Sequence, residues 1–226
     1  MSEGLAARQW DAEYRRGRYA AEPPLPFTGT ILDVLARRGV ARDAPGLYVG
    51  CGNGRNWAPL ADGGLTLWGL DISAEALRQL AARRPAQAGR LLLGDFRDFQ
   101  PPTAFAYLIA IQVFQHGTQA DAAAYFRRAA GLLAPGGLLF VRVNSASTQV
   151  FHRHAVVDEN PHGGFTVQYL EGPKQGLAVH FYARAELDAL TRAAFRCVQP
   201  PREEVIHRAP PRSGFWAQWE TVYERR

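Results

Sequence analysis

The fold is decided by the stretch Gly46-Leu47-Tyr48-Val49-Gly50-Cys51-Gly52-Asn53-Gly54-Arg55. Its apolar residues Leu47 to Val49 predict the end of a buried strand, and three alternating glycines follow them. The next residues, Asn56-Trp57-Ala58-Pro59-Leu60, can begin a helix. A strand, a glycine turn and a helix start in this order let the backbone come close to a ligand, with amide groups facing it. The pattern predicts a ligand-binding turn in an α/β domain.

A carboxylate stands roughly twenty residues after the turn, as in nucleoside-binding folds. The second apolar run, Leu65-Thr66-Leu67-Trp68-Gly69-Leu70, ends in Asp71. At the end of a second strand, a carboxylate is placed to accept hydrogen bonds from the two ribose hydroxyls of a nucleoside. The turn and Asp71 together predict a site for a cofactor that contains a nucleoside.

Strands and helices alternate after the turn. Strands are predicted at 46–49, 65–71, 90–93, 104–111 and 138–143, and helices from about Asn56, Ser73 and Gln119. Such alternation is typical of a mostly parallel sheet with helices on both faces. Two further strands, about 195–198 and 214–223, would close the sheet. We therefore expect a doubly wound α-β-α sandwich with seven mostly parallel strands, one of them antiparallel.

The flanking segments are expected to shape a pocket. Residues 1–40 predict two helices that cap the glycine turn. Residues 145–182 predict a lid or substrate insertion. It begins with a polar loop rich in histidine over 145–164, and a loop of this length is often functional. Within the insertion, 165–170 and 178–182 alternate like the two strands of a hairpin. Since no linker separates a second part, we expect a single domain over 1–226.

Composition argues against several classes of partner. The formal net charge is +5, but Lys174 is the only lysine and the arginines are spread in small groups. We expect no nucleic-acid partner, because no run of like charges marks a binding tail. No apolar run approaches the roughly 20 residues of a membrane span. Cys51 and Cys197 give no disulfide framework, and no secretory layout is visible, so a cytoplasmic location is expected.

The glycine turn distinguishes between two kinds of cofactor. A dinucleotide-binding dehydrogenase would need Gly-x-Gly-x-x-Gly, with a small residue at the last place for close helix packing. Here the third glycine, Gly54, comes one residue early, and Arg55 occupies the place where bulk is excluded. The turn therefore does not favour a nicotinamide cofactor.

The chain resembles the class I S-adenosylmethionine-dependent methyltransferases from about Trp10 to its end. Gly50 to Arg55 is similar to that family's first motif, and Leu70-Asp71-Ile72-Ser73 is similar to its second. Three further similarities follow in family order: Gly94-Asp95-Phe96, Leu132 to Leu139, and Phe181-Tyr182 with Glu186-Leu187 and Ala194-Phe195. The resemblance implies a Rossmann-like fold, S-adenosylmethionine as cofactor and S-adenosylhomocysteine as product.

The resemblance also implies positions for the site. Residues expected to contact the cofactor are Tyr48, Gly50, Cys51, Gly52, Asn53, Asp71, Ile72, Asp95, Phe96 and Gln112. Residues expected to line the substrate pocket are Trp10, Tyr14, Tyr19, His116 and Asn144. His116 is also the candidate general base, although a purely structural role in its loop is equally open. Aromatic residues at helical spacing are also often core residues.

Three positions depart from the family pattern. Tyr48 stands where the family usually has an acidic residue that helps hold the methionine end of the cofactor. No acidic residue stands near Tyr107 at the start of strand four, and Ala194 replaces a common glycine. These departures leave the ribose and adenine positions in place.

The histidine-rich segment raises the question of a metal site. His152 and His154 alternate, with His162 nearby, but the spacing is irregular and we expect no metal.

The sequence favours an enzyme that transfers a methyl group to a small-molecule acceptor by in-line displacement. Two alternatives stay open: a methyltransferase acting on RNA or protein, and a module that binds S-adenosylmethionine without catalysis. The acceptor and the oligomeric state are not fixed by these patterns.

Overall fold

A computed structural model describes residues 3–226 of the chain. The residues group into two compact units, Met1–Ile109 and Ala110–Arg226, and each is described by itself. The expectation that residues 1–226 form a single domain stays a prediction.

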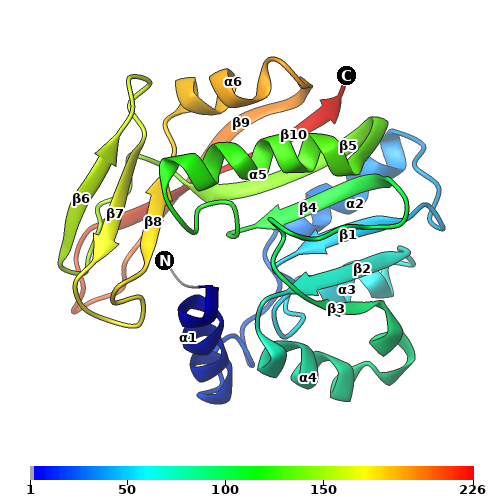
Figure 1. Cartoon of the computed structure of the whole chain (residues 1–226), viewed down its shortest axis with the longest axis horizontal. Helices are drawn as coiled ribbons and strands as arrows, with labels where there is room; N and C mark the ends of the chain where they lie inside the picture. The colour runs from blue at the N-terminus through cyan, green and yellow to red at the C-terminus, as the bar shows by residue number, and fades with distance from the viewer. Residues whose placement is uncertain (1–2) are drawn as a thin grey trace. The chain divides into compact units, whose positions relative to one another are not determined.

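Seven strands form one sheet in the order β3-β2-β1-β4-β5-β10-β9 (Figure 1). Their bounds are β1 Gly46–Val49, β2 Leu67–Asp71, β3 Leu91–Leu93, β4 Phe105–Ile111, β5 Leu133–Asn144, β9 Phe195–His207 and β10 Phe215–Arg225. β2 is parallel to β1 and to β3, whereas β10 is antiparallel to both of its neighbours, β5 and β9. The predicted seven-stranded, mostly parallel α/β fold is confirmed.

In the first unit, the helices are α1 Glu3–Arg15, α2 Phe27–Arg37, α3 Trp57–Asp62 and α4 Ala74–Arg83, followed by the 3-10 helix η1 Pro85–Arg90. α4 begins where predicted, because the Ser73 hydroxyl accepts a hydrogen bond from Ala76 N (3.1 Å). Its Leu77 and Leu80 side chains are buried. α1 packs beside α4 (Figure 1), so the N-terminal helix lies next to the segment that follows Asp71.

In the second unit, α5 Gln119–Leu132 begins with a capping box formed by Thr118 and Asp121, and α6 Arg184–Thr191 precedes β9. A smaller sheet contains β6 His154–Glu159, β7 Phe165–Tyr169 and β8 Ala178–Phe181, in that order. β7 and β8 pair antiparallel, which confirms the predicted hairpin. The hairpin's predicted role in a lid stays a prediction.

The prediction of a polar loop over 145–164 is wrong for residues 154–159, because these residues form β6. This strand lies at the edge of the smaller sheet, and its Val156 and Val157 side chains are exposed. An edge strand exposed in this way lacks the in–out alternation from which strands are recognised.

Two strands are longer than the sequence predicted. β5 begins at Leu133 rather than at the predicted residue 138, because residues 134–137 are part of the strand. β9 continues through Pro200 and Pro201 to His207. The pairing with β10 shifts register at this point, and β9 is an edge strand of the large sheet. Proline is tolerated at such bulges and edges because no ladder hydrogen bond is lost there.

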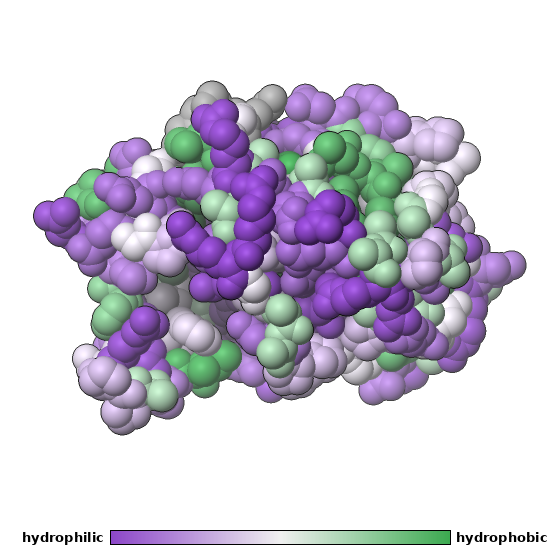
Figure 2. Space-filling model, turned by 90° about the horizontal axis from the view of Figure 1, so that it is seen from below, coloured by the Kyte–Doolittle hydropathy of each residue, from purple (hydrophilic) through white to green (hydrophobic). Residues whose placement is uncertain are grey.

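Figure 2 shows a face on which hydrophilic residues predominate and hydrophobic residues form separate, smaller patches. Within residues 3–226, no helix has the length and apolar character that crossing a bilayer requires.

Candidate active site

The glycine turn follows β1 and requires glycine at two positions. Gly52 and Gly54 have φ angles of 54° and 93°, a region that other residues rarely adopt. A Cβ atom on Gly54 would lie 2.5 Å from Leu80 Cδ1, and one on Gly52 would lie 2.4 Å from the Tyr14 hydroxyl oxygen. The backbone of the turn is therefore closely covered by α4 and α1.

Asp71 ends β2 and points its carboxylate at the glycine turn. Asp71 Oδ2 accepts a hydrogen bond from Gly52 N (2.7 Å), and Oδ1 accepts one from Ser73 N (2.8 Å). The residue is only 7% exposed. A carboxylate has about four lone-pair positions, so acceptor capacity remains for a hydroxyl donor such as that of a ribose.

Burial is the main influence on the protonation of the Asp71 carboxylate. Burial raises the pKa of Asp71 to about 6, while hydrogen bonds from the backbone of Ser73, Gly52 and Ile72 lower the pKa. The neighbouring carboxylate of Asp11 raises the pKa further. Asp71 is therefore mostly ionised at neutral pH, in the form that accepts hydrogen bonds.

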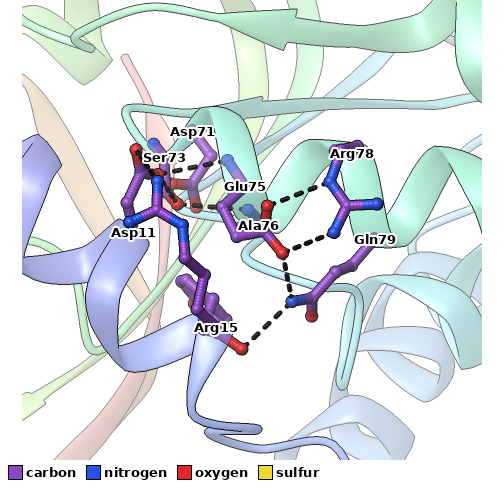
Figure 3. Close-up of polar contacts among 9 residues, drawn as sticks. Asp11, Arg15, Asp71, Ser73, Glu75, Ala76, Arg78 and Gln79 are labelled. Carbon is purple, nitrogen blue, oxygen red and sulfur yellow. Dashed lines mark hydrogen bonds and ion pairs between the residues drawn. The ribbon is translucent and has the colours of Figure 1, made fainter.

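α1 is fastened to the start of α4 beside Asp71 (Figure 3). Asp11 Oδ1 accepts hydrogen bonds from Ser73 Oγ (2.6 Å) and from Glu75 N (3.1 Å). Gln79 Nε2 donates to Tyr14 O (3.0 Å) and to Glu75 Oε1 (2.8 Å). Asp11 satisfies a backbone N–H that α4 itself leaves without an acceptor, so α1 and α4 hold one another.

The three aromatic residues predicted to line the pocket from the N-terminal segment come together in the first unit. The ring centroids of Trp10 and Tyr14 are 6.2 Å apart, and those of Tyr14 and Tyr19 are 6.3 Å apart. Burial, together with the negative charge of Asp71, raises the pKa of Tyr14, so its hydroxyl stays protonated. Tyr14 thus brings a hydroxyl group to Gly52, where the predicted cofactor site begins.

Asp95 follows β3, and its carboxylate is held by a neighbouring side chain. It accepts hydrogen bonds from Arg97 N (2.8 Å), Nε (3.1 Å) and Nη2 (2.6 Å). Burial alone would raise the pKa of Asp95, but the bonds from Arg97 outweigh it and lower the pKa. Phe96 beside it is buried. The predicted adenine contact of these two residues stays a prediction.

The other predicted cofactor residues of the first unit differ in exposure. Tyr48 and Cys51 are buried, and the Cys51 sulfur lies 2.8 Å from where Gly69 would carry a Cβ. Asn53 Nδ2 donates to Arg18 O (3.1 Å), whereas Ile72 is half-buried. In this arrangement Tyr48 and Cys51 contribute to packing, and only the backbone at Cys51 belongs to the turn.

The predicted site residues of the second unit follow β4 and end β5. Gln112 has a φ of 60°, and its N–H donates to Arg142 O (2.7 Å). Asn144 N donates to Gln115 Oε1 (2.9 Å), and Asn144 Oδ1 accepts from Gln218 Nε2 (3.3 Å). Gln115 was not among the predicted site residues, because the residues around it in the sequence do not indicate a contact with β5.

The backbone of His116 is fixed by its contacts, and its imidazole is uncharged at neutral pH. Its carbonyl accepts a hydrogen bond from Tyr125 Oη (2.9 Å), and it forms a β-bridge with Val179. Burial, with the positive charge of Lys174, lowers the pKa of His116 to about 3. The imidazole is therefore neutral at physiological pH and is a weak base.

The histidine-rich segment makes local contacts. His154 Nδ1 donates to His152 O (2.8 Å), and His152 Nδ1 lies 3.8 Å from Glu171 Oε1. Within the described part of the chain, no group of three or more His, Cys, Asp or Glu side chains is arranged to hold a metal ion.

Comparison with known proteins finds a family match over part of the chain. Residues 47–137 match the family model described as a methyltransferase domain. The chain is 30% identical over 159 residues to a ubiquinone biosynthesis O-methyltransferase from Caulobacter sp. (strain K31), over 61% of this chain and 58% of that protein. The match thus spans less than two thirds of the length of this curated relative.

Solved structures share the fold at low sequence identity. The 1,6-didemethyltoxoflavin-N1-methyltransferase of Burkholderia thailandensis has a TM-score of 0.64 and 19% identity, covering 99% of this chain and 89% of that one. Magnesium protoporphyrin IX methyltransferase from Synechocystis PCC 6803 has a TM-score of 0.64 and 14% identity, covering 99% and 97%.

A mostly parallel sheet with a glycine turn after β1 and a buried carboxylate at the end of β2 is typical of Rossmann-like α/β folds. Residues 47–137 match a methyltransferase domain, in keeping with the sequence motifs. The fold is shared with solved methyltransferase structures.

Proposed function

We propose that this chain is an S-adenosylmethionine-dependent methyltransferase that transfers a methyl group to a small-molecule acceptor by in-line displacement. The observation that carries the proposal is the contact between Gly52 N and the Asp71 carboxylate at the glycine turn. The names of the similar proteins support a small acceptor, since they refer to ubiquinone biosynthesis, 1,6-didemethyltoxoflavin and magnesium protoporphyrin IX.

The residues at the turn fit the nucleoside of S-adenosylmethionine. The Tyr14 hydroxyl lies against Gly52 and offers a polar group there, and Asp71 retains acceptor capacity for a ribose hydroxyl. Ile72 is half-buried beside Asp71 and offers an apolar surface to the adenine. When bound, the cofactor supplies an activated methyl group, so the chain's own residues have to bind, orient and exclude water.

His116 then serves best as a neutral hydrogen-bond acceptor. With a pKa near 3, its imidazole can orient a hydroxyl or amine nucleophile but takes a proton only weakly. An acceptor whose nucleophile is already deprotonated, or loses its proton to water, suits such a site. The same weakness favours a second candidate function, in which the chain binds the cofactor without transferring its methyl group.

Calorimetry followed by turnover separates the two functions. We expect S-adenosylmethionine and S-adenosylhomocysteine to bind, while a nicotinamide dinucleotide does not. We then expect S-adenosylhomocysteine to be released with at least one acceptor from a panel of small phenols, amines, thiols and carboxylic acids. Binding without release for every acceptor would favour the binding module, and absence of binding would contradict both functions.

A further inference from the structure

An exposed aromatic ring in the second unit is flanked by two arginines. The Phe151 side chain is 48% exposed. The guanidinium carbon of Arg208 lies 5.4 Å from its ring centroid, and that of Arg212 lies 5.3 Å from it. We refer to these three residues as the Phe151 cluster. Both distances lie within the range of a cation–π contact.

The cluster is built on an anchored backbone. The Arg208 guanidinium donates hydrogen bonds to Gln149 O and to Ser213 O, the latter at 3.0 Å. Gln149 N donates to Phe215 O (3.2 Å), which ties the segment before Phe151 to β10. Arg208 is therefore held in place by carbonyl groups, and these do not neutralise its charge.

The charge of the cluster is not compensated by acidic groups. Within the described residues, neither Arg208 nor Arg212 forms an ion pair, and the Arg212 guanidinium lies against the Phe151 ring. Two guanidinium groups close to one ring repel one another, and exposure to water screens this repulsion only in part. An anion bound close to them would offset this repulsion.

Tyr19 provides an internal comparison. Its ring is also approached by two guanidinium groups, those of Arg18 (5.0 Å) and Arg55 (5.7 Å). There, however, Arg18 lies 3.7 Å from Glu13, and Arg55 lies 2.8 Å from Glu22. Among residues 3–226, carboxylates thus pair with the arginines at the Tyr19 ring and with neither arginine at the Phe151 ring.

The chemistry of the cluster defines the class of ligand. Guanidinium groups match the planar, bidentate geometry of carboxylate and phosphate, and they do so while stacked on aromatic rings. The exposed part of Phe151 offers apolar surface to a flat ring. We propose that the Phe151 cluster is a binding site for a small aryl anion, a flat ring that carries a carboxylate or a phosphate. This site lies in the second unit and does not depend on the proposed methyl transfer.

Fluorine NMR of small probes tests the site on the full chain. 4-Fluorobenzoate and 4-fluorophenyl phosphate represent the two anionic groups, and 4-fluorobenzyl alcohol is the neutral control. We expect the two anions to show line broadening that saturates, with affinities at least tenfold above that of the alcohol. The carboxylate and phosphate probes, titrated separately, show which anion the site prefers. Equal binding of the alcohol, or competition by inorganic phosphate alone at the same strength as the aryl phosphate, would overturn the proposal.

Matched variants locate the binding. Arg212→Gln removes one guanidinium that holds no backbone group, and we expect it to weaken both aryl anions at least fivefold. Phe151→Leu should weaken them to a similar extent. Arg18→Gln, which removes the same charge from the Tyr19 ring, should leave anion affinity within twofold. If Arg212→Gln has no effect, or if Arg18→Gln has an equal effect, the assignment is wrong. Binding of S-adenosylhomocysteine by Arg212→Gln, measured in parallel, reports on the proposed function separately.

Discussion

Replacing Asp71 by asparagine keeps the shape of the side chain but removes its charge and one acceptor oxygen. Gly52 N and Ser73 N donate to its two oxygens at 2.7 and 2.8 Å, so one buried N–H would face the new amide NH2 group. An unsatisfied buried donor of this kind lowers the free energy of unfolding by about 1–3 kcal/mol. The ribose hydroxyls also lose a charged acceptor, so we expect S-adenosylhomocysteine to bind weaker by about 2 kcal/mol, or roughly thirtyfold.

The pH dependence of stability carries a definite sign. Burial raises the pKa of Asp71 from 3.8 to about 6, so the folded protein keeps a proton that the unfolded chain releases. Its contribution to stability is therefore complete below about pH 4 and is lost as the pH rises through about 6, with a span of about 3 kcal/mol. Asp71→Asn should abolish this component of the profile.

Calorimetry with S-adenosylhomocysteine at neutral pH, and urea unfolding between about pH 4 and pH 7, measure both effects. Asp43→Asn is the matched control, because Asp43 is exposed and is not one of the predicted cofactor residues. We expect the control to change affinity less than threefold, on the order of 0.6 kcal/mol. Unchanged affinity in Asp71→Asn would refute the placement of the ribose. An unchanged stability profile would refute the raised pKa.

Three further substitutions test the surroundings of Asp71 and the second unit. Gly52→Ala should lower the unfolding free energy by about 1–3 kcal/mol in a urea titration, because of its positive φ and the Tyr14 hydroxyl; the cost should shrink in a Tyr14→Phe background. Asp11→Ala should cost about 1 kcal/mol and speed proteolysis within α1, since α4 loses two hydrogen bonds. His116→Asn should leave the pH–rate profile between about pH 5 and 8 unchanged in shape, because the imidazole does not titrate there; a lost limb would restore its role as a base.

Much of the fold could be predicted from the sequence, because its elements depend on the type of residue at a few neighbouring positions. A strand, a glycine turn and a capped helix each leave a signal within a few residues, as at Gly52 and Ser73. β6 and the second half of β9 gave no such signal. One is an exposed edge strand, and the other contains Pro200 and Pro201, which the register shift opposite β10 accommodates.

A smaller part of the candidate site could be predicted from the sequence. Asp71 was predicted from its spacing to the turn, and its carboxylate accepts a hydrogen bond from Gly52 N. Its contact with a ribose stays a prediction. The neighbouring Ser73 hydroxyl donates to Asp11, which lies 62 positions earlier in the sequence. The sequence around an aspartate on an amphipathic helix does not indicate such a distant partner. The state of His116 likewise follows from burial and from Lys174, which only the folded chain brings near it.

Transfer of an isotopically labelled methyl group tests the central claim most directly. The full chain would be incubated with trideuteromethyl S-adenosylmethionine and the acceptor panel, and both products followed by mass spectrometry. We predict equal amounts of S-adenosylhomocysteine and of one trideuteromethylated small molecule, with little of either in Asp71→Asn at cofactor concentrations that saturate only the unmodified chain. Cofactor binding with no labelled product from any acceptor class would contradict the claim that this chain is a methyltransferase of small molecules.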